Sequence, residues 1–207
     1  MSSSSDPARA RILDAATTLF AQYGFQRTGM GDIARAAGLS RQSLYVRFRN
    51  KGEVFEALAA ALKDGALAAA TAAWNDQVTL EENLAATVLA KDLPLYRLLK
   101  ASPHGAELLA VDAGLTAAYA LELDRGFAAL LAARLKTLQK AGEIDLGDLG
   151  GSAAFARTFA MAAVGLKHEA PDEAAYLEAV HRLCRIAARA VSSSPARSDR
   201  RRPARGR

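Results

Sequence analysis

One cysteine, Cys184, occurs among the 207 residues, so no disulfide bond can form within the chain. The only soft metal ligand near it in sequence is His181, which argues against a zinc site. No apolar run approaches the roughly 20 residues that a membrane-spanning helix needs, and the first residues lack the basic and apolar segments of a signal peptide. These absences predict a cytoplasmic protein with no membrane partner, no metal and no other cofactor.

Strand-forming sequence is also scarce. Runs of β-branched residues are missing, and apolar and polar residues nowhere alternate over the length of a strand. Alanine and leucine dominate instead, and hydrophobic residues make up 51% of the chain, enough for a packed core. The composition therefore predicts an all-α fold.

Charged residues are divided unevenly along the chain. Residues 1–51 carry eight Lys or Arg against three acids, and residues 192–207 carry six Arg against one Asp. Because the net charge of the whole chain is +5, residues 52–191 are net acidic. A basic head joined to an acidic body predicts that only part of the protein meets a polyanion such as nucleic acid.

Four helices are expected in the first third of the chain. Apolar residues at three- and four-residue spacing indicate a first helix over 7–23. A short second helix is expected from Thr28, as its N-cap, to Ala37, and a third begins after the cap at Ser40. An alanine-rich amphipathic pattern then predicts one long helix over 51–73 that connects the head to the body.

Further helices are expected in the body, with breaks at Pro94, Pro103 and Pro171. Their predicted ranges are 80–91, 94–102, 104–112, 115–141, 148–168 and 172–191. The last residues are rich in Ser, Pro and Arg and are predicted to be disordered. The expected domains are a three-helix DNA-binding domain over 1–51, a ligand-binding and dimerisation domain over 52–191, and a basic tail over 192–207.

The two short helices, joined at Gly38, meet the requirements of a helix-turn-helix motif, whose second helix lies in the major groove of DNA. Arginine can bond guanine and glutamine can bond adenine, so Arg41 and Gln42 are the expected base readers. Neighbouring hydroxyls and cations can hold phosphates. The full set of expected DNA contacts is Thr28, Ser40, Arg41, Gln42, Ser43, Tyr45, Arg47 and Lys51.

About twenty residues of the head stand in an order and spacing that a bare helix-turn-helix does not require. They are Arg11-Ile12-Leu13, Ala15-Ala16, Leu19-Phe20, Gly24-Phe25, Thr28, Met30, Asp32-Ile33-Ala34, Ala37-Gly38-Leu39-Ser40, Leu44-Tyr45, Phe48 and Lys51. This pattern resembles the N-terminal signature of the TetR family of bacterial transcriptional regulators. Gly29 and Gly31, in the first turn of the second predicted helix, depart from it. The family more often has a hydroxyl residue at the position of Gly29. The resemblance implies a regulator whose DNA affinity changes when a small molecule shifts the long connecting helix.

Many apolar side chains of the body favour an apolar or aromatic small-molecule effector. The candidate pocket residues are Trp74, Tyr96, His104, Tyr119, Phe127 and Phe159. For each of these taken singly, ordinary packing in a helical core is the more common role.

Apolar stripes in the last two predicted helices exceed what one small core needs and predict a homodimer. The stripes are Phe155, Phe159, Ala162, Ala163 and Leu166, and Tyr176, Leu177, Val180, Leu183, Cys184 and Ala187. Four such helices can close a bundle about a two-fold axis.

Several functions compete at this point. An enzyme is disfavoured, and no catalytic residue is expected, because the chain has no glycine elbow around a serine, no paired histidine ligands and no glycine-rich phosphate loop. A nonspecific or architectural DNA-binding protein is favoured by the basic tail. A repressor released by its effector is the leading hypothesis, while an activator of the same fold stays open because operator position decides the sign of regulation.

Overall fold

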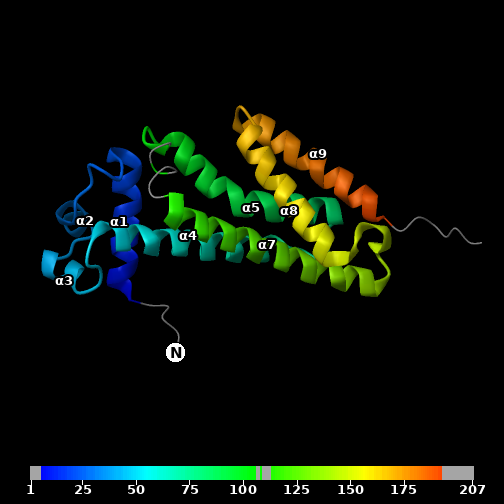
Figure 1. The fold of residues 1–207 in the computed structure, drawn as a ribbon, viewed down its shortest axis with the longest axis horizontal. Coiled ribbons are helices and arrows are strands. Elements are labelled where there is room, and N and C mark those ends of the chain that lie inside the picture. The colour runs from blue at the N-terminus through cyan, green and yellow to red at the C-terminus, as the bar shows by residue number, and fades with distance from the viewer. Residues whose placement is uncertain (1–5, 106–107, 109–112, 193–207) are drawn as a thin grey trace, which may run out of the picture. The chain divides into compact units, whose positions relative to one another are not determined.

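The computed structural model describes residues 6–105, 108 and 113–192, and these residues confirm the all-α prediction (Figure 1). The helices are α1 (Pro7–Tyr23), α2 (Met30–Ala36), α3 (Arg41–Tyr45), α4 (Lys51–Ala73), α5 (Leu80–Ala101), α7 (Ala113–Ala141), α8 (Gly151–Glu169) and α9 (Glu173–Val191). Two compact units result, one of residues 1–76 with 86–126 and one of residues 77–85 with 127–207. No helix of the described part is both long and apolar enough to cross a membrane.

Helix α1 has the predicted bounds, and both of its ends follow from local chemistry. Asp6 is the N-cap, where its carboxylate accepts the backbone N–H of Ala8 at 2.9 Å, and Pro7 occupies the first turn, where no N–H is needed. Gly24 ends the helix with φ at 82°, a conformation that favours glycine.

The helix-turn-helix is confirmed with one shift of boundary. Helix α2 is capped by Gly29, whose N–H is bonded by the Asp32 carboxylate at 3.2 Å, and not by Thr28 as predicted. Thr28 fails as a cap because its side chain turns inward, as described below. The turn at Gly38 has φ at 65°, and Ser40 caps α3 by accepting the Ser43 N–H at 3.0 Å.

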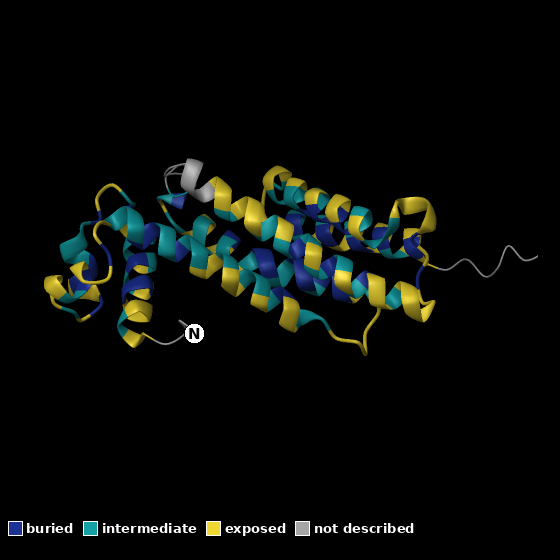
Figure 2. Cartoon of the chain, turned by 60° about the horizontal axis from the view of Figure 1, so that its bottom comes forward, coloured by how far each residue is buried: buried dark blue, intermediate teal, exposed yellow. Residues whose placement is uncertain are grey.

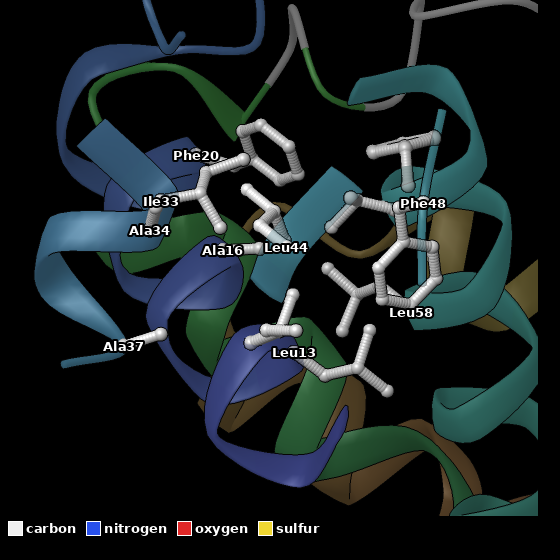
Figure 3. Close-up of a cluster of buried hydrophobic side chains, with 12 residues drawn as sticks. Leu13, Ala16, Phe20, Ile33, Ala34, Ala37, Leu44, Phe48 and Leu58 are labelled. Carbon is white, nitrogen blue, oxygen red and sulfur yellow. The ribbon is translucent and has the colours of Figure 1, made fainter. Parts of the chain in front are cut away.

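A single hydrophobic cluster joins the first four helices (Figure 3). Its members are Ile12, Leu13, Ala16 and Phe20 of α1, Ile33, Ala34 and Ala37 at α2, Leu44 and Phe48 at α3, and Val54, Phe55 and Leu58 of α4. Phe20, Phe25 and Phe55 pack ring against ring, with centroids 5.3 to 5.8 Å apart. Each large side chain buried here contributes about 1.5–3 kcal/mol of transfer free energy, so the short helices α2 and α3 are held by α1 and α4.

Helix α4 has the predicted range 51–73 and packs against α7 within the first unit. Lys63 Nζ lies 2.8 Å from Glu122 Oε2, and this hydrogen bond raises the pKa of Lys63. A methyl group on Gly126 would lie only 2.9 Å from Cδ1 of Leu67, so the two helices approach closely where α7 has no side chain.

The predicted break at Pro94 is wrong, because α5 runs unbroken from Leu80 to Ala101. Proline removes one backbone hydrogen bond and costs roughly 3 kcal/mol within a helix. Buried side chains on both sides of it, such as Val88 and Tyr96, belong to one continuous packed helix and offset that cost. The predicted helix at 104–112 lies mostly outside the described residues.

In the second unit, α8 and α9 pack on each other through one face and leave the other exposed (Figure 2). Phe159 and Ala163 of α8 and Tyr176 and Val180 of α9 are buried. Burial raises the pKa of the Cys184 thiol to about 12, so this thiol is an inert core group. Ser192 is described, while residues 193–207 of the predicted tail lie outside the described residues.

Asp6 also ties the start of α1 to the end of α3, since Arg47 Nε lies 2.6 Å from its carboxylate. This hydrogen bond is the main cause that lowers the pKa of Asp6 below its ordinary 3.8. A lowered pKa means that the ionised carboxylate stabilises the fold above 3.8, and that this contribution is lost as the pH falls through the folded value.

We therefore expect Asp6→Asn to lower the free energy of unfolding at neutral pH, although Asn keeps a capping oxygen. Urea unfolding at neutral pH and well below pH 3.8 measures the effect, and the two proteins should converge in acid. Asp14→Asn removes the same charge from an exposed position of α1 and serves as the control. A difference that is the same at both pH values would contradict the role of the ion pair.

Candidate DNA-binding surface

Helix α3 shows a sharp division between inward and outward side chains. Leu44 is fully buried and Phe48 is 6% exposed, and both belong to the core cluster of the head. Arg41, Gln42 and Tyr45 are exposed. The buried pair therefore anchors the helix from behind, and the predicted base readers lie on its free face.

Arg41 and Gln42 occupy the first turn of α3, the part of a recognition helix that reaches base edges. Within the described residues, no side-chain hydrogen bond or ion pair engages either of them. The five N–H donors of the Arg41 guanidinium and the amide of Gln42 are thus available for the bidentate contacts that guanine and adenine accept.

Ser40 and Ser43 hold the start of α3 in place. The hydroxyl of Ser40 accepts the Ser43 N–H, and the two Oγ atoms lie 2.9 Å apart. Tyr45 is 53% exposed. The two serine hydroxyls are already bonded to each other.

The side chain of Arg47 is hydrogen-bonded within the head and is also partly exposed to solvent. Its guanidinium bonds the Asp6 carboxylate and, through Nη1, the backbone oxygen of Ser43 at 3.1 Å. The side chain is 31% exposed, so part of the guanidinium still faces solvent. A phosphate would have to share this cation with Asp6.

Lys51 has a structural role that the sequence did not indicate. Its Nζ donates to the backbone oxygens of Phe25 at 2.8 Å, Gln26 at 3.0 Å and Thr28 at 3.3 Å, and it lies 4.5 Å from the Phe25 ring centroid. An ammonium group has three N–H donors, and three carbonyls take them. Lys51 therefore binds the α1–α2 connection to α4.

Thr28 lies inside that connection. Its side chain is 3% exposed, and its hydroxyl donates to the Gly24 oxygen at 2.8 Å. This buried hydrogen bond stabilises the turn that follows α1, and the hydroxyl does not lie on the outer surface. Thr28 and Lys51 are thus bonded to backbone oxygens of the α1–α2 connection, while the other six predicted contacts have side chains at least partly exposed to solvent.

The predicted effector-binding residues are distributed over both units. Trp74, Tyr96, His104 and Tyr119 belong to the first unit, and Phe127 and Phe159 belong to the second. Tyr96, Phe127 and Phe159 are buried, while the Trp74 indole donates to Asp76 at 2.9 Å. Lys63 Nζ lies 5.9 Å from the centroid of the Tyr119 ring.

Helix α5 buries two charged side chains. Lys91 and Asp92 are each 3% exposed, and Lys91 Nζ lies 2.8 Å from Asp92 Oδ1. Such side chains are rarely buried unless paired, and nothing in the local sequence distinguishes them from surface charges. In the described part of the chain, no three His, Cys, Asp or Glu side chains are grouped as metal ligands.

A shallow depression of about 520 Å³ lies on the head and not among the predicted effector residues. It is bordered by α1 and the end of α2, with Arg11, Asp14, Thr18 and Gln22 on its rim.

Comparison with known proteins supports the assignment of the head. Residues 12–58 match the family model of bacterial regulatory proteins, tetR family. The regulator AcrR of Shigella flexneri is 45% identical over 47 residues, and TtgR of Pseudomonas putida is 44% identical over 50 residues. These matches span 22% and 24% of the relatives' own lengths and 23% and 24% of this chain.

Solved structures extend the likeness of fold to the body. SmeT in complex with triclosan has a TM-score of 0.65 at 19% identity, and the alignment covers 92% of this chain and 94% of SmeT. A TetR-family regulator from Mesorhizobium loti has a TM-score of 0.68 at 20% identity and covers 92% and 100% of the two chains. The head therefore carries the sequence signature of the TetR family at residues 12–58, and the solved structures show a similar fold.

Proposed function

We propose that this protein is a transcriptional repressor that binds a palindromic DNA operator as a homodimer and is released by a small apolar or aromatic molecule. One observation carries the proposal: Arg41 and Gln42 are exposed on α3, and their side chains make no hydrogen bond or ion pair within the described residues, while Leu44 of the same helix is buried in the core of the head. The head over residues 1–51 would bind DNA, and residues 52–191 would bind the effector and the second subunit. A DNA partner is consistent with a cytoplasmic location.

The operator should be an inverted repeat. One helix of five residues reads too few base pairs for a specific site, so two copies must read one face of the duplex. Their half-sites would be about 34–36 Å apart, one turn of DNA. Sequence preference would come from Arg41 and Gln42, and phosphate contacts from Ser40, Ser43, Tyr45 and part of Arg47.

The proposed dimer interface is the outer face of α8 and α9. Met161 of α8 is 70% exposed and Ile186 of α9 is 60% exposed, although both are large apolar side chains. Six of the eleven stripe residues named from the sequence are buried in the second unit, and the other five remain partly exposed. The outer residues remain for a second copy, which would complete a four-helix bundle.

Release by an effector requires an element that both the DNA surface and the effector site can move. Helix α4 suits this role within the first unit, because its start belongs to the core of the head and its middle contacts α7 at Glu122 and Gly126. SmeT, which has a similar fold, binds the apolar aromatic molecule triclosan. We therefore take triclosan as a first trial effector.

Selection from random DNA should enrich a palindrome, and Arg41→Ala should relax the preference at one base of each half-site by about 1–3 kcal/mol. Arg49→Ala is the matched control, since Arg49 is highly exposed and pairs with Glu53 outside α3. Binding that is equal on all sequences would instead indicate a nonspecific DNA-binding protein. An Arg41→Ala protein with unchanged preference would show that another residue reads that base.

Introducing a charge on the outer face of α8 or α9 should separate the subunits. Met161→Arg and Ile186→Arg are expected to yield monomers by light scattering at micromolar concentration, because an arginine would be buried without a partner. Leu121→Arg changes a side chain that is 50% exposed on α7 and should remain dimeric. A wild-type protein that is monomeric under these conditions refutes the dimer.

Triclosan should weaken operator binding, and by linkage the operator should weaken triclosan binding by the same factor, about 5–150-fold. Both affinities can be titrated by fluorescence anisotropy and calorimetry. Gly126→Ala crowds Leu67 and should alter this factor, whereas Gly65→Ala on α4 has open space and should not. Tight triclosan binding that leaves operator affinity unchanged would contradict the switch.

A further inference from the structure

Gly31, in the first turn of α2, is in close contact with Arg41 of α3. A methyl group on Gly31 would lie 2.6 Å from Nη2 of Arg41 and 3.0 Å from both Cζ and Nε. The guanidinium therefore lies across the bare backbone of Gly31, in space that any other residue would occupy. This contact gives a physical reason for one of the two glycines that depart from the family signature.

The contact differs from those of the neighbouring arginines. Arg35 is paired with Asp32 at 2.8 Å, and Arg47 is paired with Asp6 at 2.6 Å. In the described part of the chain, Arg41 has no such ion-pair partner, and its guanidinium lies against the backbone of Gly31. Its hydrogen-bond donors are not used by another side chain.

We propose that Gly31 is a positioning residue for DNA sequence recognition: it leaves the space in which the Arg41 guanidinium is held before DNA binds. This inference rests on the proposed function, since it assumes that Arg41 reads a base. The physical reason is conformational entropy. A free arginine side chain loses many rotamers when it is fixed on a base edge, and a side chain that is already ordered loses fewer.

Replacement of Gly31 should separate folding from recognition. Alanine favours a helix over glycine, and the group it would displace is the far end of a flexible side chain, not backbone. Gly31→Ala should therefore fold with equal or greater thermal stability. Arg41, in contrast, must leave its place and would reach the base from a disordered or altered rotamer.

The experiment compares five full-length proteins by selection from random DNA and by titration of the enriched site and its single-base variants. They are the wild type, Gly31→Ala, Arg41→Ala, the double variant of these two, and the control Gly65→Ala, a glycine of α4 with open space around it. We expect Gly31→Ala to lose about tenfold in discrimination at the same base pair that Arg41→Ala affects. The double variant should lose no more than Arg41→Ala alone, and Gly65→Ala should match the wild type.

A measurement without DNA tests the contact itself. The Nε–H resonance of Arg41, assigned by its absence in Arg41→Ala, should shift in Gly31→Ala and stay in place in Gly65→Ala. A resonance unchanged in Gly31→Ala overturns the proposal whatever the DNA result. Unchanged discrimination by Gly31→Ala or by Arg41→Ala, on a palindrome that the wild type selects, also overturns it. A wild type that selects no palindrome refutes the proposed function, and the resonance then decides whether Gly31 holds Arg41.

Discussion

A helix of five residues cannot fold alone, since isolated helices shorter than about 12–15 residues are marginal even in favourable sequences. Helix α3 exists because Leu44 and Phe48 are buried in a core that α1 and α4 complete. The same packing fixes which side chains of α3 face outward. The orientation of Arg41 and Gln42 therefore depends on the packing of the whole head, including the position of α4.

Positive charge in the head serves two purposes that a count of basic residues cannot separate. Lys51 and Arg47 hold connections together, through backbone oxygens in one case and Asp6 in the other. Arg41 is packed on Gly31 and keeps its donors free. Under the proposed function, all of these charges would contribute to the long-range attraction of DNA. Short-range recognition would fall to the fewer groups whose donors are not already used.

Elements specified by local chemistry could be predicted from the sequence. The range 7–23, the turn at Gly38 and the cap at Ser40 depend on neighbouring residues and were predicted correctly. Pro94 was misjudged because packing along α5 outweighs its local cost. The bonds that Thr28 and Lys51 make within the head, and the burial of the pair Lys91–Asp92, were not foreseen, because they arise only in the folded chain and no residue spacing encodes them.

The path by which α4 could act on recognition follows from its contacts within the first unit. At its middle, α4 meets α7 through Lys63 and Leu67. At its start, Lys51 is bonded to the three backbone oxygens of the connection that leads into α2. A displacement of α4 must therefore either break these bonds or pull that connection, and with it the first turn of α2, where Gly31 lies against Arg41. Under the proposed switch, the effector would thus alter the placement of a base-reading side chain within each head, in addition to the spacing between the two heads of a dimer.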